Sequence, residues 1–230
     1  MTARRRRREL QGVFIASLMG TAGCMAGIAT TVAEPIPLTR ASDVAVLAIM
    51  PGIVDPGSEW LRPHAMDRLV VELEEQLPGT RIVPPDESGR RLAERGLAQE
   101  YASILHDFEE AGVVDPDRVD AIASAVGATH FLTTRTGYQD ERLERTTTNL
   151  DGTPLVYRTK RQELYLVARL WEPVQYAPSW EAVVESRSQA GFWSSDREPI
   201  EVVDALIDRL AEQLVTSVDV ASTLGGAGAR

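Results

Sequence analysis

One continuous apolar run, residues 43–50, most constrains the fold of this chain. It reads Asp-Val-Ala-Val-Leu-Ala-Ile-Met and lies between Ser42 and the pair Pro51-Gly52. Strands that are buried on both faces have such runs rich in β-branched residues, whereas half-exposed strands alternate between apolar and polar residues. The run therefore predicts a buried central strand.

The segments after this strand show clear helical or strand periodicity. Apolar residues at three- and four-residue spacing predict helices over 59–77, 86–111 (with a break at Gly96), 115–127 and 198–218. Shorter or alternating runs predict strands over 80–84, 129–138, 164–171 and 180–188. The order β-α-β-α-α-β-β-β-α predicts an α/β (α+β) fold: a layered mixed sheet with packing helices and a late antiparallel hairpin.

The amino terminus has the three zones of a secretory signal. Five arginines, Arg4–Arg8, precede an apolar stretch from Leu10 to about Gly20, and small residues follow. This arrangement is typical of an export signal. We therefore expect residues 1–23 to be a signal peptide, 24–42 a tether, 43–218 a single folded domain and 219–230 a disordered tail.

The signal ends at the only cysteine of the chain. Thr21, Ala22 and Gly23 lead to Cys24, and this ending resembles the lipobox of bacterial lipoproteins, although Thr21 stands where that family usually has Leu. The resemblance implies that Cys24 carries the lipid and anchors the chain to a membrane. Met25 is not the Asp associated with inner-membrane retention, so the resemblance favours the outer membrane and a domain facing the periplasm.

Two other interpretations of the amino terminus stay open. Cleavage after Ala33, in the sequence Thr31-Val32-Ala33, would release a soluble protein. The stretch from Leu10 to Ala33 is also just long enough to span a bilayer, which takes about 20 residues, so an uncleaved anchor is the third reading.

Charge and cysteine content exclude several classes of function. Removal of the signal takes away five arginines and Glu9, which leaves a net charge of −14 from 24 basic and 34 acidic residues in the whole chain. Such a field repels nucleic-acid phosphates and anionic lipid headgroups. With one cysteine, the chain has no internal disulfide and no cysteine-based zinc site, so its own core must hold the domain.

The sequence contains no recognisable catalytic or metal-binding motif. His64, His106 and His130 are far apart, and neither a metalloprotease helix, a nucleophile elbow nor a phosphate loop is present. Asp115, Asp117 and Asp120 lack the glycine and glutamate of a calcium loop, and helix capping explains them. We expect no catalytic residue, no metal site and no cofactor.

The charged segment between the two late strands is the candidate contact site. The sequence Asn149-Leu150-Asp151-Gly152 predicts a hairpin turn, and the residues around it are polar or charged. We expect an exposed hairpin arm that contacts a partner through Arg142, Arg145, Thr147 and Tyr157, with a merely solvated ribbon as the alternative.

A helix-to-strand step supports a family resemblance over residues 43–216. The stretch Gly127-Ala128-Thr129-His130 follows an Ala-rich helix and precedes a strand that contains Gly137, and Trp180 opens a later strand. This pattern resembles the family that includes the TolB amino-terminal domain, the curli-secretion lipoprotein CsgG and LpoB-like activators.

The resemblance implies an assembly or binding module rather than an enzyme. We therefore expect an outer-membrane-anchored periplasmic lipoprotein that binds an envelope protein, with a homo-oligomer as a further expectation. The alternatives are a subunit of an oligomeric secretion complex and a periplasmic enzyme. The arm is too charged and too rich in Thr for the pore-forming version of the family.

Overall fold

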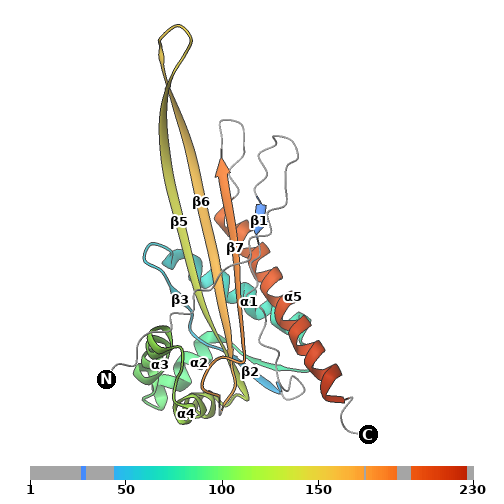
Figure 1. Cartoon of the computed structure of the whole chain (residues 1–230). Helices are drawn as coiled ribbons and strands as arrows, with labels where there is room; N and C mark the ends of the chain where they lie inside the picture. Colours follow the sequence, from blue (N-terminus) through green and yellow to red (C-terminus); the bar gives the residue numbers. More distant parts are fainter. Residues whose placement is uncertain (1–26, 30–43, 174, 191–197, 227–230) are drawn as a thin grey trace, which may run out of the picture.

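The computed structural model describes residues 27–29, 44–173, 175–190 and 198–226. These residues form an α/β fold with one mixed sheet, in the strand order β1-β7-β6-β5-β2-β4, and β3 pairs with β5 beside this path (Figure 1). Strand β2 runs parallel to β4 and β5, whereas β5, β6, β7 and β1 pair antiparallel. The expected fold class is confirmed.

The helices cluster in the first half of the chain and at its end. A 3-10 helix (Glu59–Leu61) leads into the first α-helix, and the α-helices are α1 (Arg62–Gln76), α2 (Pro85–Glu94), α3 (Ala98–Ala111), α4 (Pro116–Val126) and α5 (Pro199–Gly226). Gly96, at φ 68°, separates α2 from α3 as expected, because this left-handed conformation suits a residue without Cβ.

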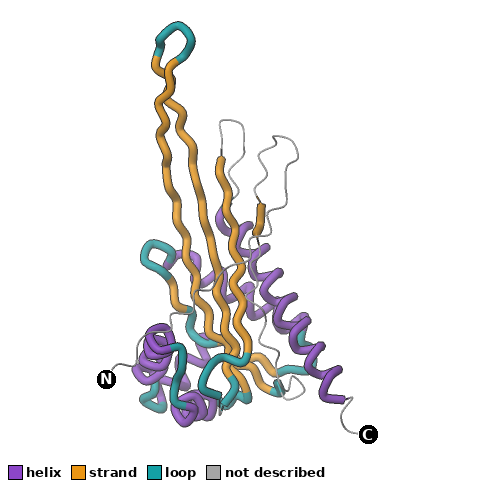
Figure 2. Tube along the Cα trace, in the orientation of Figure 1, coloured by secondary structure: helices purple, strands orange, loops and turns teal. Residues whose placement is uncertain are grey.

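The strands differ greatly in length. They are β1 (Gly27–Ala29), β2 (Val46–Ile49), β3 (Ile53–Val54), β4 (Arg81–Val83), β5 (His130–Thr148), β6 (Pro154–Trp171) and β7 (Trp180–Ala190). The two longest, β5 and β6, make a hairpin that rises well above the rest of the molecule (Figure 2).

Two hydrophobic clusters lie on opposite faces of the sheet. On one face α1 and α5 pack against even-numbered positions of β5, β6 and β7, including Leu132, Leu166 and Val184. On the other face α2, α3 and α4 cover Ala48 of β2 and Met50, which directly follows β2, together with Phe131 and Trp171. Strand β2 is thus buried from both sides, which explains its continuous apolar sequence.

Two fully buried tryptophans fasten the base of the sheet to its helices. Trp171 stacks on Phe131 at 5.9 Å between ring centroids, and its indole N–H donates to Thr133 Oγ1 at 3.0 Å. On the opposite face the Trp180 N–H donates to Ser217 Oγ of α5 at 3.1 Å. Both rings therefore bury large apolar areas without leaving a polar group unpaired.

Several boundaries differ from those that the sequence predicts. Strands β5 and β6 continue to Thr148 and back from Pro154, about ten residues beyond the expected strand ends, because a hairpin ladder needs only backbone pairing and not apolar alternation. Helix α5 ends at Gly226 rather than at residue 218, so most of the expected disordered tail is helical; its first strong helix breakers are Gly225 and Gly226.

Two short strands were not expected from the sequence. Strand β3 lies in the loop after β2 and pairs with β5 at Arg135 and Thr136. Strand β1 lies within residues 24–42, the expected tether, and pairs antiparallel with β7. At two and three residues, both are too short to show a periodicity. Within the described part of the chain, none of the helices has the length and apolar character needed to cross a membrane.

Gly137 is required by a close contact between β5 and β6. A Cβ at this position would lie 2.6 Å from the hydroxyl oxygen of Tyr165 and nearer still to its ring. We expect Gly137→Ala to lower the free energy of unfolding by about 1–3 kcal/mol, because the ring must move out of place. Urea denaturation of the purified domain measures this loss. Gly79→Ala is the matched control: a Cβ there meets nothing within 4 Å, and equal losses at the two positions would contradict the explanation.

Candidate functional site

The hairpin beyond the end of β7 is the candidate functional site, and residues 142–160 are called the arm below. The last pair of β7 joins Ala190 to Lys160, which itself pairs with Arg142. Beyond that level β5 and β6 continue alone for six further pairs, from Leu143↔Thr159 to Thr148↔Pro154. Among the described residues, no third strand and no helix supports this part of the ribbon.

The turn that closes the arm is the one expected from the sequence. The Asn149 N–H donates to the Thr153 carbonyl at 2.8 Å, and the Gly152 N–H donates to the Asn149 carbonyl at 2.9 Å. Gly152 has φ 86°, and the Asp151 carboxylate accepts from the Thr153 N–H at 2.9 Å. These local bonds define a single turn and therefore a single register for the arm.

All four residues expected to contact a partner lie in the arm. Arg142 is in its first pair, opposite Lys160; Arg145 pairs with Tyr157, and Thr147 pairs with Leu155. Arg142 and Thr147 are five positions apart on one strand, so they lie on opposite faces of the ribbon. The structure brings the four together on one element but divides them between two faces, which the sequence did not indicate.

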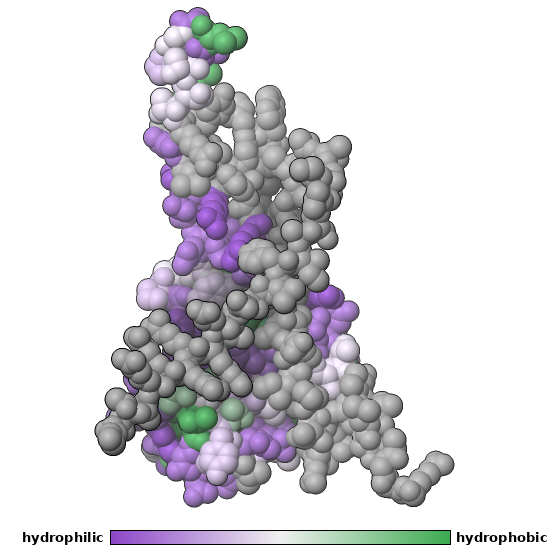
Figure 3. Space-filling model, in the orientation of Figure 1, coloured by the Kyte–Doolittle hydropathy of each residue, from purple (hydrophilic) through white to green (hydrophobic). Residues whose placement is uncertain are grey.

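The arm exposes apolar side chains at its outer end. Leu150 is fully exposed, and the exposed fractions of Leu155 and Val156 are 37% and 55%. Figure 3 shows hydrophobic atoms beside hydrophilic ones at the tip of the arm. A two-stranded ribbon without a core is marginally stable in water, and burial of apolar side chains contributes about 25 cal/mol per Å². Contact with another surface would stabilise the arm on both counts.

Polar residues stabilise the root of the arm, which is the part of β5 and β6 where the hairpin leaves the body of the domain. These residues lie on the face of the sheet that α2, α3 and α4 cover. The Asp55 carboxylate accepts hydrogen bonds from the Tyr165 hydroxyl and from Arg135 Nε, the latter at 2.9 Å, and Arg135 Nη1 binds Glu109 at 2.9 Å. Burial, and then the hydrogen bond with Asp55, raise the pKa of the Tyr165 phenol, so it stays a neutral donor. Gly137 makes room for its ring.

The opposite face of the root has a second brace. Ser58 Oγ accepts from the Tyr138 N–H at 2.9 Å, Gln162 Nε2 donates to the Tyr138 hydroxyl at 2.9 Å, and the rings of Trp60 and Tyr138 meet edge to face at 6.0 Å. The loop after β2 therefore makes contacts on both faces of the hairpin. Sequence reasoning missed these residues, because Asp55 and Tyr165 are 110 positions apart and nothing local links them.

The histidines lie on separate elements and form no common site. His64 Nε2 of α1 is 2.7 Å from the Asp204 carboxylate of α5, His106 is 3.4 Å from Glu110, and the buried His130 is 3.2 Å from Thr129 Oγ1. No group of three or more metal-ligating side chains occurs in the part of the chain that the structure describes.

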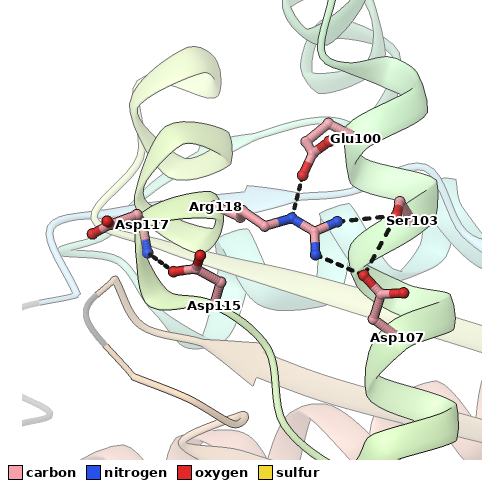
Figure 4. A network of polar contacts seen from close by, with 6 residues as sticks. All are labelled: Glu100, Ser103, Asp107, Asp115, Asp117 and Arg118. Carbon is pink, nitrogen blue, oxygen red and sulfur yellow. Dashed lines mark hydrogen bonds and ion pairs between the residues drawn. The ribbon is translucent and has the colours of Figure 1, made fainter.

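Of the three aspartates considered for calcium binding, Asp115 caps a helix. The Asp115 carboxylate accepts from the Asp117 N–H at 3.0 Å and caps α4 (Figure 4). In the same view Arg118 of α4 reaches α3, where it binds Glu100, Ser103 at 3.0 Å and Asp107 at 2.6 Å. This network joins two helices that cover the sheet.

The signal and lipobox residues Thr21, Ala22, Gly23 and Cys24 lie outside the described residues, as does the alternative cleavage site at Ala33. The expected lipid attachment at Cys24 therefore stays a prediction.

Comparisons with known proteins identify no family. No family model and no curated protein matches the chain. The expected membership of the TolB, CsgG and LpoB family stays a prediction.

Solved structures similar to this chain include three bacterial proteins. The PelC dodecamer of Paraburkholderia phytofirmans is 12% identical, with a TM-score of 0.41, over 83% of this chain and 95% of its own. Lipoprotein GNA1162 of Neisseria meningitidis is 14% identical, with a TM-score of 0.41, over 73% and 99%. A putative neuraminyllactose-binding hemagglutinin homolog of Helicobacter pylori is 10% identical, with a TM-score of 0.42, over 79% and 91%. At these values the likeness carries no argument about function.

The contact between Arg118 and Asp107 makes the stability of the domain depend on pH in the acidic range. The hydrogen bond from Arg118 lowers the pKa of Asp107 from the ordinary value of 3.8. The stabilisation is therefore fully present above that value and is lost as the pH falls through the lower pKa of the folded state. We expect Arg118→Met to reduce stability at pH 7 and to flatten the loss of stability below about pH 4, as measured by denaturation at a series of pH values.

The matched control is Arg90→Met, which removes an exposed ion pair within one helix, Arg90 to Glu94 at 2.6 Å. Exposed pairs of this kind contribute little, so we expect a smaller change at pH 7. Parallel pH curves for the natural protein and Arg118→Met would show that the network does not act in this way.

Proposed function

We propose that this chain is an exported lipoprotein, anchored through Cys24 to the periplasmic side of the outer membrane, that acts by binding an envelope protein through its arm. The observation that carries the proposal is the length of ribbon, residues 142–160, that extends beyond the helical layers with its described side chains exposed. A folded domain gains no core from such an element, and exposed apolar groups at its tip are typical of contact surfaces.

The interior of the domain supports a binding role rather than catalysis. Buried polar groups such as Thr133 and Ser179 are used in hydrogen bonds within the fold. The charged clusters around Arg118 and Asp55 join one element to another, and the partners of the two residues are oppositely charged side chains or neutral hydroxyl groups. These clusters connect helices and strands within the fold. The arm is therefore the element that remains available for contact with a partner.

The anchor is tested by changing the cysteine. We expect the mature protein to begin at Cys24 with a diacylglyceryl group and to sediment with membranes, and Cys24→Ala to lose both properties. Mass spectrometry of the amino-terminal peptide, together with membrane fractionation, measures the outcome. Thr21→Leu keeps the thiol and serves as the control that retains the lipid. A mature peptide that begins at Glu34 would refute the anchor and support cleavage after Ala33.

The arm is tested by removing it while its root is kept. We expect a variant in which residues 143–159 are replaced by Asn-Gly to keep the free energy of unfolding within about 1 kcal/mol, since exposed residues contribute little, and to lose its crosslinks to an envelope protein in cells. Urea denaturation and crosslinking with mass spectrometry measure the two effects.

A second variant separates the length of the arm from its chemistry. Alanine at Arg142, Arg145, Thr147 and Tyr157 keeps the hairpin and removes the expected contact groups, so we expect the same loss of crosslinks. Crosslinks that persist in both variants would place the contact elsewhere on the domain.

A further inference from the structure

The short strand β1 pairs with the part of β7 that is nearer the arm. Gly27 pairs with Arg187 and Ala29 with Glu185, while β7 runs from Trp180, opposite Leu170 at the base, to Ala190, opposite Lys160. Because β1 is antiparallel to β7, Gly27 is the end of β1 that lies nearer the arm. Figure 1 shows β1 beside the upper part of β7.

This pairing leaves almost no tether between the anchor and the domain. Cys24 precedes Gly27 by three residues, and three residues span at most about 11 Å. The expected tether of residues 24–42 would have held the domain away from the lipid, whereas the strand pairing holds the sheet within about 11 Å of the acylated residue.

The arm beyond its first pair lies outside the reach of the anchor. Gly27 is level with Arg187, Glu163 and Gln139, three pairs before the arm begins at Arg142. Three pairs span about 10 Å, so Cys24 reaches at most the level of the first pair of the arm. The six further pairs extend about 20 Å past it.

These distances exclude both upright orientations of the domain. If the arm pointed straight into the membrane, its outer 20 Å or so would enter the hydrocarbon core. Glu144 and Asp151 would then lie in lipid, and the open edges of the two-stranded ribbon would lack hydrogen-bond partners. If the arm pointed away, the base of the sheet would face the lipid. Trp180 is seven residues of strand from the level of Gly27, about 23 Å, which exceeds the reach of Cys24.

The remaining orientation places the arm along the surface of the membrane, and the two faces of the ribbon differ in polarity. On the even-numbered face the pairs Arg142↔Lys160 and Glu144↔Arg158 carry four charged residues. On the odd-numbered face the arm has Leu143, Arg145, Thr147, Leu155, Tyr157 and Thr159. Only one of these six is charged, and Tyr and Arg are residues that suit the boundary between headgroups and acyl chains.

The charge of the arm agrees with a lipid surface. Residues 142–160 contain four basic and two acidic residues, a net charge of +2, in a chain whose net charge is −10. The arm is therefore a local exception to the negative net charge of the protein. Arg145 is the one charged residue of the odd-numbered face, and a basic residue near an anionic leaflet contributes about 1 kcal/mol of attraction. The other three basic residues are on the even-numbered face.

From this geometry we propose that the odd-numbered face of the arm, with Leu155 at its outer end, lies on the headgroup layer of the membrane that holds Cys24. The even-numbered face is then left for the protein partner. This inference rests on the acylation of Cys24 proposed above. Of the two faces of the arm, the odd-numbered one contacts the lipid.

Neighbouring residues on opposite faces provide the test. The full chain is produced with its own signal in two versions, Leu155→Cys and Val156→Cys. When Cys24 is acylated, the new cysteine is the only free thiol and takes an environment-sensitive fluorophore. The labelled proteins are reconstituted into vesicles of phosphatidylethanolamine and phosphatidylglycerol. We expect emission at shorter wavelength, and several-fold stronger quenching by a lipid-borne quencher, at position 155 than at 156, and no such difference in detergent.

Each other result overturns the proposal. Equal quenching at the two positions, or stronger quenching at 156, removes the assignment of the face. A signal that follows the density of protein in the membrane rather than the presence of lipid assigns the face to a second copy of the chain. Mass spectrometry of the same preparations separates the two hypotheses: an unmodified Cys24 refutes the anchor and the orientation together, whereas an acylated Cys24 with equal quenching refutes the orientation alone.

Discussion

Burial of the sheet between two helical layers stabilises this fold, and that burial ends before strands β5 and β6 do. At the base, β2 has apolar contacts on both faces, and Trp171 and Trp180 are fully buried on opposite sides of the sheet. Toward the other end the helices stop, and from Asp140 onward the described side chains of β5 are exposed. The same two strands are therefore the centre of a core at one end and a bare ribbon at the other.

The root of the arm lies between the buried part and the exposed part of β5 and β6. Asp55 and Ser58, from the loop after β2, bind Tyr165, Arg135 and Tyr138 across the hairpin. These bonds fix the direction in which the ribbon leaves the body, which local pairing alone would not do, because an isolated hairpin twists and bends easily. The buried end thus gives the arm a defined position relative to β7 and β1.

Strand β1 connects the direction of the arm with the proposed function. A flexible tether would leave the orientation of the domain on its membrane undefined, whereas pairing at Gly27–Ala29 ties the expected anchor to the edge of the sheet. The reach of three residues and the length of six strand pairs are then sufficient to relate the arm to the lipid surface. In the arrangement that we propose, the anchor would hold a contact surface in place as well as prevent diffusion.

Features that depend on local chemistry could be predicted from the amino-acid sequence. Continuous apolarity over residues 43–50 predicted the central strand, which the structure has at Val46–Ile49. Asp115 and Gly127 bounded α4, and Asn149–Gly152 located the turn of the arm. Tertiary structure alone decided the extent of β5 and β6, the braces from Asp55 and Ser58, and the place of β1 on β7. The physical reason is that these features depend on backbone pairing and polar contacts between residues far apart in the chain, which leave no apolar periodicity, whereas strands and helices that face a core do.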